Sequence, residues 1–406
     1  MVTYTEARRI VAEAAQECVR KAPRARESVT LDAAFGRVLA EPLAADRDAP
    51  PFDRSTRDGF AVRSTDVSAV PATLKLTAEL AAGAEFRGTV APGECVQIMT
   101  GAAVPPGADA VVMIEHTQPA GDRVIVERTV AKGANVVPRG REATAGTQVL
   151  AAGQRMGYAE LSIAAQFGHA QLSVFARPRL AVLSTGDELV PVEQVPGPFQ
   201  SRNSNSYSLV AQVSLAGGAP VPLGTAPDER AALRAKIEQG LAADALVLSG
   251  GVSMGKYDLV EEVLRSLGAE FRFDAVSMRP GKPTAFGVCR GKPVLGLPGN
   301  PVSTMVTFEL FGVPLVDVLS GAPVRPLAVA NARTKRAIHE KAALAHFVPA
   351  KLSREGSETY AEQLSWQGSG DVAALAQADC YLVVTERQLE FSAGDWVEVL
   401  LRRDRV

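Results

Sequence analysis

One segment constrains the fold of this 406-residue chain more than any other: the apolar run 245–249 and the turn that follows it. The continuous run Ala-Leu-Val-Leu-Ser is typical of a strand buried on both faces of a sheet. Gly-Gly-Val-Ser-Met-Gly comes next, and glycines let the backbone turn sharply and approach a ligand. Free N–H groups in such a turn, and at the start of the next helix, attract anions. The turn Ser249–Gly255 therefore predicts a phosphate site in an α/β domain.

The neighbouring sequence repeats this alternation of apolar strands and amphipathic helices. We expect strands at 180–184, 221–223, 271–276, 284–288 and 294–297, and helices at 206–216, 228–239, 259–267 and from Pro301 onward. This order predicts a parallel sheet with helices on both faces. Ligands of such sheets bind at the carboxyl ends of the strands, where the polar turns of this segment fall.

The rest of the chain is too long for one core and divides by composition. Apolar residues at helical spacing over 3–22 predict a helix that ends at Pro23, and the cap signal at Thr30 predicts a second, short helix. Short β-branched runs broken by turns predict β domains between Pro50 and Pro138 and after Pro323. The predicted fold is a multidomain α/β protein with a helical platform (1–45 with 147–176), an inserted β lid domain (46–146), the parallel-sheet α/β domain (177–323) and a C-terminal β-barrel-like domain (324–406).

Charge and cysteine content exclude several classes of function. A formal net charge of −2 and a pI near 6.2 provide no general attraction to nucleic acid or to an anionic membrane. The four cysteines form no CxxC pair and the four histidines lack zinc-binding spacing, so we expect neither a zinc site nor a disulfide framework. The charged N-terminal residues do not form a signal peptide, and no run of about 18 apolar residues predicts a membrane span. We therefore expect a soluble cytoplasmic protein.

The glycine-rich turn offers several candidate phosphate ligands. The backbone N–H groups of Gly250, Gly251 and Gly255 are candidate donors to a phosphate, and Ser249 and Ser253 add hydroxyl donors. The alternative is an ordinary turn between a strand and a helix. We favour the phosphate site because two glycines and two serines exceed what a turn requires.

Carboxylates at two strand ends are candidate Mg²⁺ ligands. Asp258 stands where the turn meets the next helix, so it either caps that helix or binds a metal ion attached to phosphates. Asp187 and Glu188 follow the first strand and point to opposite sides of an extended segment, which leaves one of them free for Mg²⁺ or a polar ligand. Mg²⁺ prefers a few carboxylates together with phosphate oxygens. A solvated turn is the alternative for this pair.

Two proline-containing loops supply cations and a helix cap. Arg279-Pro-Gly-Lys-Pro is a rigid loop whose Arg279 and Lys282 suit an oxyanion. In Pro298-Gly-Asn-Pro-Val-Ser the prolines stiffen the turn, and Asn300 or Ser303 can cap the helix that follows. The prolines are better explained as turn residues, whereas Lys282 lies beside the expected site.

The β lid domain contains polar segments at 53–60, 99–109 and 139–142. Asp58-Gly59 alone is an ordinary turn, and a basic stretch such as the one that ends at Glu142 is usually a solvated face. From the residues alone we interpret both as structural.

Taken together, these segments resemble the molybdopterin molybdenumtransferase family, which includes the MoeA proteins and the E domain of gephyrin. In chain order the matching segments are PPFDRSTRDGFAV (50–62), IMTGAAVPPGADAVV (98–112), NVVPRGRE (135–142), STGDEL (184–189), SGGVSMGKYD (249–258), PGKPTAFG (280–287) and LPGNPVS (297–303). They extend across nearly the whole chain. The series SGGVSxGxxD, PGKP and PGNPVS is highly specific.

The resemblance implies an enzyme that inserts molybdate into adenylylated molybdopterin, cleaves the pyrophosphate and releases AMP with the help of Mg²⁺. It also implies an elongated homodimer whose site lies between the molybdopterin-binding α/β domain of one subunit and the lid domain of the other. Candidate protein partners are then the molybdopterin adenylyltransferase and acceptor molybdoenzymes.

The resemblance also assigns roles to the residues at matching positions. It implies that Asp58, Glu142, Glu188, Asp228 and Asp258 are the catalytic carboxylates, with Glu188 and Asp258 as Mg²⁺ ligands. The phosphate and pterin ligands that it implies are Ser249, Gly250, Gly251, Ser253, Gly255, Lys282, Arg279, Thr100, Pro298 and Asn300.

Four positions depart from the family pattern. Glu142 stands where Asp is frequent, and Arg279 stands where Lys is common, which replaces a point charge with a forked guanidinium. Asp228 follows Ala-Pro in place of an acidic pair, and the arginine expected after Phe347 is missing. Two other functions stay open: adenylylation of molybdopterin by a similar α/β core, and a non-catalytic scaffold on the same fold.

Overall fold

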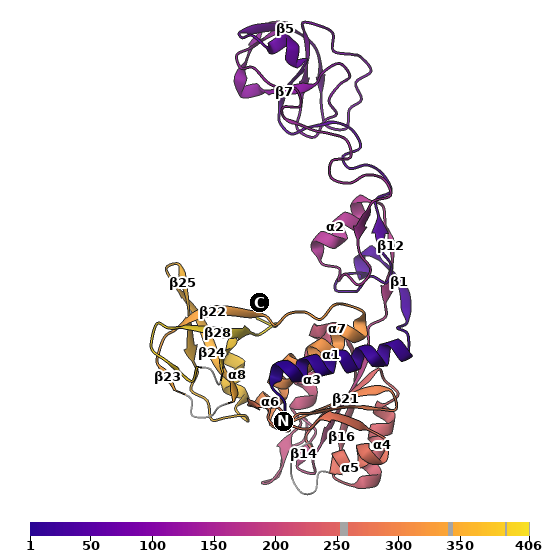
Figure 1. The fold of residues 1–406 in the computed structure, drawn as a ribbon, viewed down its shortest axis with the longest axis vertical. Helices are drawn as coiled ribbons and strands as arrows, with labels where there is room; N and C mark the ends of the chain where they lie inside the picture. Colours follow the sequence, from indigo (N-terminus) through magenta and orange to yellow (C-terminus); the bar gives the residue numbers. More distant parts are fainter. Residues whose placement is uncertain (252–258, 340–343, 386–387, 406) are drawn as a thin grey trace.

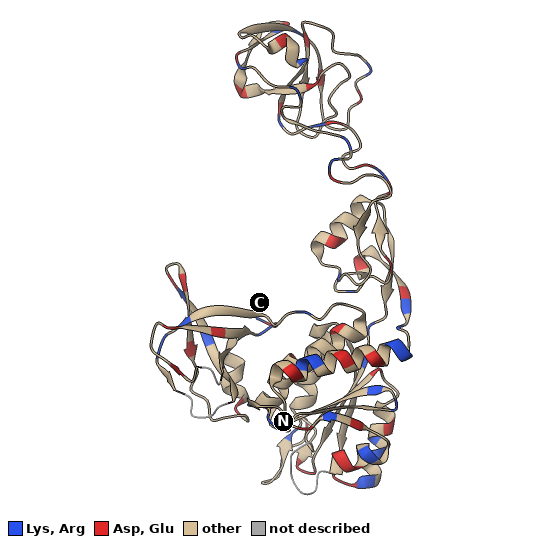
Figure 2. Cartoon of the chain, in the orientation of Figure 1, with Lys and Arg blue, Asp and Glu red and all other residues tan. Residues whose placement is uncertain are grey.

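The computed structural model describes residues 1–251, 259–339, 344–385 and 388–405. The molecule is elongated, and its lid domain lies at the far end of an arm, away from the α/β domain and the C-terminal β domain (Figure 1). Acidic and basic residues are interspersed along the chain in all of these parts (Figure 2).

A six-stranded sheet in the order β16-β13-β17-β21-β20-β18 forms the centre of the α/β domain. Its strands are β13 (Arg179–Thr185), β16 (Ala219–Ala226), β17 (Ala245–Ser249), β18 (Glu270–Phe273), β20 (Ala285–Cys289) and β21 (Lys292–Leu297). The first four strands of that order run parallel, so their carboxyl ends share one edge. Each strand predicted in this domain is present.

The sheet departs from the expected parallel arrangement at β20, which runs antiparallel to both of its neighbours. Arg290 and Gly291 alone join β20 to β21, and both have positive φ, 52° and 76°. A two-residue turn with this backbone joins antiparallel strands. The dipeptide Arg-Gly lacks the usual Asn-Gly or Asp-Gly signal, which is why the pattern did not predict a hairpin.

Helices cover both faces of this sheet, as predicted. Alternate residues of β13 show the two layers: Leu180 and Val182 belong to one buried cluster, and Ala181 and Leu183 belong to the other. The first cluster is formed with α1 (Tyr4–Lys21), α3 (Asn205–Ala216), α6 (Pro301–Thr307), the π-helical turn η4 (Phe308–Gly312) and α7 (Val313–Ser320). The second is formed with α4 (Arg230–Gly240) and α5 (Leu259–Ser266).

The run Pro301–Ser320 is the most apolar of these helical segments, with a mean hydropathy of 1.6. By length and composition it is the one helix in the described part of the chain that would suffice to cross a membrane. In the structure 89% of its most apolar 18-residue stretch is buried, and the segment packs beside α1 and α3 (Figure 1). It is the core helix of the α/β domain.

A small domain, which we call the arm (26–45 and 147–176), lies between the α/β domain and the lid. It contains β1 (Arg26–Thr30), β2 (Leu43–Ala44), β11 (Gln148–Leu150), β12 (Gln171–Phe175) and α2 (Tyr158–Gln166), with β1 paired to β12 and β2 to β11. The short helix expected from Thr30 is a single 3-10 turn, Leu31–Ala33. The sequence predicts that helix α1 belongs to one domain with the arm (1–45 with 147–176). In the structure α1 packs instead on α7 and β21 of the α/β domain.

The lid is a β domain with one six-stranded sheet, as the short β-branched runs predict. Its sheet has the order β7-β4-β6-β5-β9-β8, and a separate pair joins β3 to β10. The strands are β3 (Arg54–Ser55), β4 (Gly59–Val62), β5 (Ala72–Leu80), β6 (Glu94–Ile98), β7 (Ala110–Met113), β8 (Thr117–Ala120), β9 (Arg123–Val126) and β10 (Val136–Val137).

The C-terminal domain is a closed barrel of five strands. Its order is β24-β25-β22-β28-β26, and an additional pairing of β26 with β24 closes it. The strands are β22 (Val329–Thr334), β24 (Ala345–Glu355), β25 (Glu358–Gln363), β26 (Cys380–Val384) and β28 (Trp396–Leu401), and a short helix, α8 (Val372–Gln377), precedes β26. Strand β19 (Met278–Arg279) of the α/β domain pairs with β24 and ties the two domains together.

Candidate functional site

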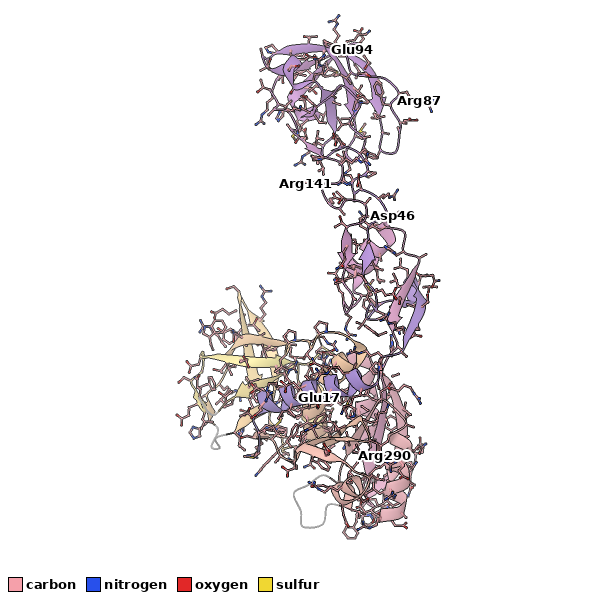
Figure 3. The ribbon with its side chains drawn as sticks, turned by 45° about the vertical axis from the view of Figure 1, so that its right-hand side comes forward. Glu17, Asp46, Arg87, Glu94, Arg141 and Arg290 are labelled. Atoms are coloured by element: carbon pink, nitrogen blue, oxygen red, sulfur yellow. The ribbon has the colours of Figure 1, made fainter. Side chains whose placement is uncertain are left out.

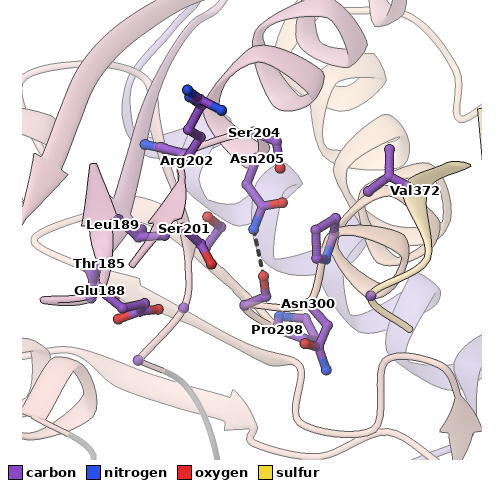
Figure 4. A pocket seen from close by; sticks show the side chains of 18 of the residues that line it. Thr185, Glu188, Leu189, Ser201, Arg202, Ser204, Asn205, Pro298, Asn300 and Val372 are labelled. Carbon is purple, nitrogen blue, oxygen red and sulfur yellow. Dashed lines mark hydrogen bonds between the residues drawn. The ribbon is translucent and has the colours of Figure 1, made fainter. Parts of the chain in front are cut away.

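A pocket of about 730 Å³ opens at the edge where the parallel strands of the α/β domain end. The end of β13, the turn after β17, the loop before α6 and the start of α3 all line it (Figure 4). This is the edge at which the sequence predicts ligand binding. The predicted residues that line the pocket are Glu188, Asp228, Ser249, Gly250, Gly251, Pro298 and Asn300.

Gly250 and Gly251 form the bottom of the turn, and both need to be glycine. Their φ angles are 89° and 64°, in the left-handed region. A Cβ on Gly250 would lie 2.5 Å from the carbonyl oxygen of Thr185, and one on Gly251 would lie 2.4 Å from the Cγ2 atom of Val260. The backbone of this turn therefore lies against the end of β13. The rest of the predicted turn, with Ser253, Gly255 and Asp258, falls outside the described residues.

A hydrogen-bonded network of small polar side chains lies under the pocket and fixes the strand ends. The Ser184 hydroxyl is 3.2 Å from that of Ser249 and 3.0 Å from that of Ser206, and it donates to Asn203 Oδ1 over 3.1 Å. Asn203 Nδ2 donates in turn to Thr225 Oγ1, on β16. The hydroxyl of Ser249 is thus already bonded within the protein.

The start of α3 and the loop before α6 form a second wall of the pocket, and this loop lies beside the turn. Asn205 Nδ2 donates to the carbonyl oxygen of Gly299 over 2.7 Å (Figure 4). Because a carbonyl only accepts, this bond fixes the orientation of the amide. Asn205 Oδ1 and Thr185 Oγ1 are buried without a hydrogen-bond partner in the described part of the chain.

The C-terminal domain completes this wall. Asn300 Nδ2 donates to Ser369 Oγ over 2.9 Å, and Val302 N donates to the carbonyl oxygen of Ser369 over 3.0 Å. The expected cap of α6 by the Asn300 side chain does not form; the carbonyl of Ser369 accepts one of the free N–H groups instead. Gly370 and Val372 follow this contact and line the pocket.

Three carboxylates gather at one edge of the pocket. The backbone N–H of Asp228 donates to Asp187 Oδ1 over 2.9 Å. Burial raises the pKa of Asp228, and the negative charges of Asp187 and Glu188 raise it further. Among the residues that the structure describes, no group of three His, Cys, Asp or Glu side chains is placed to enclose a metal ion. The donor set suits Mg²⁺ held by one or two carboxylates and by phosphate oxygens of a ligand.

The two predicted cations lie on the loop that brings Pro283 to the pocket. Arg279 and Lys282 are exposed, and neither is among the residues that line the pocket. Pairing of β19 with β24 places Arg279 opposite His346 of the C-terminal domain.

The predicted lid residues form a separate polar surface. Asp58 Oδ1 accepts hydrogen bonds from Thr100 N (2.6 Å) and Thr100 Oγ1 (2.8 Å), which together hold the pKa of Asp58 below its usual range. Glu142 Oε1 accepts from Arg54 Nη2 over 2.7 Å.

This lid surface lies far from the pocket of the same chain. No described lid residue lines the pocket. Figure 3 shows Asp46 and Arg141 at the narrow connection between arm and lid, well away from Arg290 of the α/β domain. A ligand in the pocket therefore does not meet Asp58 of its own chain.

Sequence reasoning missed several of the lining residues. The Asn-Ser-Asn-Ser run at 203–206 is a signal for the start of a helix, and it ends the segment that connects β13 to α3, so Asn203 and Asn205 were recognisable as candidates. Gly370 and Val372 had no such signal, because only the packing of the C-terminal domain brings them to the pocket.

Comparisons with known proteins cover almost the whole chain. The family descriptions "MoeA N-terminal region (domain I and II)", "Probable molybdopterin binding domain" and "MoeA C-terminal region (domain IV)" match residues 2–168, 181–318 and 331–401. The chain is 37% identical to the molybdopterin molybdenumtransferase of a Nostoc species, over 92% of this chain and 88% of that protein. It is 32% identical to the enzyme of that name from Bacillus subtilis, over 93% and 90%.

Solved structures show the same architecture. A crystal structure of a molybdopterin biosynthesis MoeA protein from Pyrococcus horikoshii superposes with a TM-score of 0.82 and 26% identity, and covers 99% of this chain and 100% of that one. Another structure of a MoeA protein from that organism has a TM-score of 0.74 and 31% identity, with 99% of each chain covered. The four-part arrangement described above is therefore shared with these proteins.

Proposed function

This chain belongs to the MoeA family of molybdopterin molybdenumtransferases, and we propose that it inserts molybdate into adenylylated molybdopterin, with cleavage of the pyrophosphate and release of AMP. Molybdenum cofactor biosynthesis is the role of the family. One observation carries the specific proposal: the turn Gly250–Gly251, which suits a phosphate, lies in the same pocket as the carboxylates Glu188 and Asp228. We place the reaction in the cytoplasm.

The pocket residues divide the work of binding and orienting the substrate. Backbone N–H groups of the turn hold the pyrophosphate, and the network under Ser249 keeps the turn against the strand ends. Glu188, with Asp258 later in the sequence, would hold Mg²⁺ together with phosphate oxygens, and the bound ion would supply positive charge beside the leaving phosphate. Asn205 and Asn300 fix the wall formed by α3 and the loop before α6. Arg279 and Lys282 supply positive charge at the rim for the oxyanion.

We propose that the complete site needs two chains. Asp58, Thr100 and Glu142 lie on the lid, outside the pocket of their own chain. In a homodimer the lid of one chain faces the pocket of the other. The two hydrogen bonds from Thr100 keep Asp58 ionised, so that Asp58 acts there as a base or as a ligand of the metal ion.

The test of the reaction is release of AMP from adenylylated molybdopterin with molybdate and Mg²⁺. We expect Asp58→Asn to abolish release while the chain stays folded and dimeric. The control is Asp122→Asn, because Asp122 is an exposed lid carboxylate in the turn between β8 and β9. Wild-type protein that is folded and releases no AMP contradicts the proposed function.

A mixing experiment tests the two-chain site separately. Asp58→Asn damages the lid and Glu188→Gln damages the pocket, so each homodimer is inactive. Random re-association makes half of the dimers mixed, and each mixed dimer has one intact site of two, so about a quarter of the wild-type rate returns by the mass action of subunit exchange. A mixture that stays inactive, although subunits exchange, shows that lid and pocket act within one chain.

A further inference from the structure

The joint between the arm and the α/β domain is built around one arginine. Arg155, in the loop after β11, donates from Nη1 to the carbonyl oxygen of Gly36 within the arm, over 2.9 Å. From Nη2 it donates to Asp317 Oδ1 in α7 of the α/β domain, over 3.1 Å. The side chain of Asp317 is 0% exposed. The guanidinium of Arg155 thus connects the two bodies through a buried carboxylate, and Arg24 makes a second link, from the Val318 carbonyl oxygen of α7 to the Phe175 ring of the arm.

Two helices end at this guanidinium. Helices α3 and α7 are closed by Gly217 and Gly321, with φ of 102° and 85°. The carboxyl end of a helix carries partial negative charge and favours a cation. A Cβ on Gly217 would lie 2.7 Å from Arg155 Nη1, and one on Gly153 of the arm would lie 3.2 Å from the carbonyl oxygen of Gly321. The arm therefore fits closely against the two helix ends.

Asp317, which accepts the hydrogen bond from Arg155, is also held by residues of the α/β domain. Arg325 donates to Asp317 from its backbone N (2.9 Å) and from Nε (2.8 Å), and its Nη2 donates to the carbonyl oxygen of Ala216 at the end of α3. Arg8 of α1 donates in turn to the carbonyl oxygen of Arg325. Asp317 is therefore a rigid acceptor, and the bond from Arg155 sets where the arm sits on it.

We propose that Arg155 is a positioning residue that fixes the angle of the arm and thereby places the lid over the pocket of the second chain. This rests on the proposed two-chain site. The lid lies at the far end of the arm, so a small rotation at the joint becomes a large displacement at Asp58 (Figure 1). Arg155 does not line the pocket, so its effect on the reaction passes through the position of the lid.

The experiment compares Arg155→Met, which keeps the length of the stem, with Arg155→Lys, which keeps the charge but loses the fork. The matched control is Arg26→Met, because Arg26 pairs with Glu41 inside the arm, with both side chains more than half exposed. Spin labels at Lys132→Cys in the lid and Gln239→Cys in α4 measure the arm directly. The four native cysteines are buried and do not compete for the label. Dilution with unlabelled chains restricts the signal to distances within one chain.

We expect Arg155→Met to broaden or shift the distance between the labels and to lower kcat for AMP release about tenfold or more, since misplacement by about 1 Å costs up to about 10²-fold. The affinity of the pocket for AMP, measured by calorimetry, should stay within about twofold of wild type by the same geometric argument. Arg155→Lys should lie between Met and wild type, and Arg26→Met should match wild type.

An unchanged label distance in Arg155→Met overturns the proposal, as does a loss of AMP affinity equal to the loss of kcat. If Arg155→Met fails to fold, the label distance and kcat are compared in Asp317→Asn and Arg155→Lys instead, because both variants retain hydrogen-bonding groups at the joint. The label distance does not depend on turnover, so a protein that releases no AMP refutes the proposed function without deciding the role of Arg155.

Discussion

The glycine-rich turn allows a quantitative test, because the chain contains a matched pair of glycines. Gly250 in the pocket and Gly268 after α5 have nearly the same φ, 89° and 87°. Alanine at either position pays for the left-handed backbone, about 1–2 kcal/mol. A Cβ on Gly268 meets nothing within 4 Å, whereas one on Gly250 lies 2.5 Å from the carbonyl oxygen of Thr185. The comparison of the two variants therefore isolates the cost of this steric contact from that of the left-handed backbone.

From this difference we expect Gly250→Ala to destabilise the α/β domain by about 1–3 kcal/mol more than Gly268→Ala does, the usual cost of forcing an extra carbon into a packed site. The shift of the turn away from β13 should also weaken binding of AMP, while Gly268→Ala should bind AMP as wild type does. Urea denaturation followed by near-ultraviolet circular dichroism gives the first quantity, and calorimetric titration with AMP gives the second. Equal destabilisation by the two substitutions, or full AMP affinity in Gly250→Ala, refutes the reasoning.

Three further predictions follow from the described contacts. Thr100→Val removes one of the two donors that lower the pKa of Asp58, so this pKa rises and the acidic limb of the pH–rate profile for AMP release moves to higher pH. The four thiols are buried, and burial raises the pKa of Cys95 to about 11 and that of Cys380 to about 12, so the native chain should not react with a disulfide reagent at neutral pH, whereas all four thiols react in denaturant. Phe308→Ala should cost about 3–5 kcal/mol because Phe308 is fully buried in the core helix, while Phe199→Ala, at a side chain that is 94% exposed, should change stability by less than about 0.5 kcal/mol in the same unfolding assay.

The elements of the α/β domain were predictable because their signal is local. Runs such as 180–184 and 245–249 are continuous and apolar, and each helix between them has an apolar face, so burial in a covered sheet follows from the letters alone. Strand β1 gives the opposite case. Its sequence Arg-Glu-Ser-Val-Thr is largely exposed and shows no alternation of apolar and polar residues. It becomes a strand only because it pairs with β12, which lies about 145 residues later in the chain.

The site divides in the same way. Glu188, Gly250 and Pro298 follow strands directly, so their place at the carboxyl edge of the sheet follows from topology. Asn205 reaches the carbonyl oxygen of Gly299, 94 residues away, only because α3 packs beside α6. The separation of Asp58 from the pocket also depends on how domains are joined, which no local pattern records.

The pair formed by Arg155 and Asp317 shows why such long-range features have to be interpreted by their geometry. The two residues are 162 positions apart, and their bond lies at the interface of two domains. A buried ion pair is weak support for stability, because removing two charges from water costs about as much as their attraction returns. This pair instead fixes the orientation of the arm, because a guanidinium donates hydrogen bonds in fixed directions and Asp317 is also held by Arg325. The two-chain site that we propose requires such a fixed direction at the base of the arm, and a contact made of apolar side chains alone would leave the angle of the arm free to change.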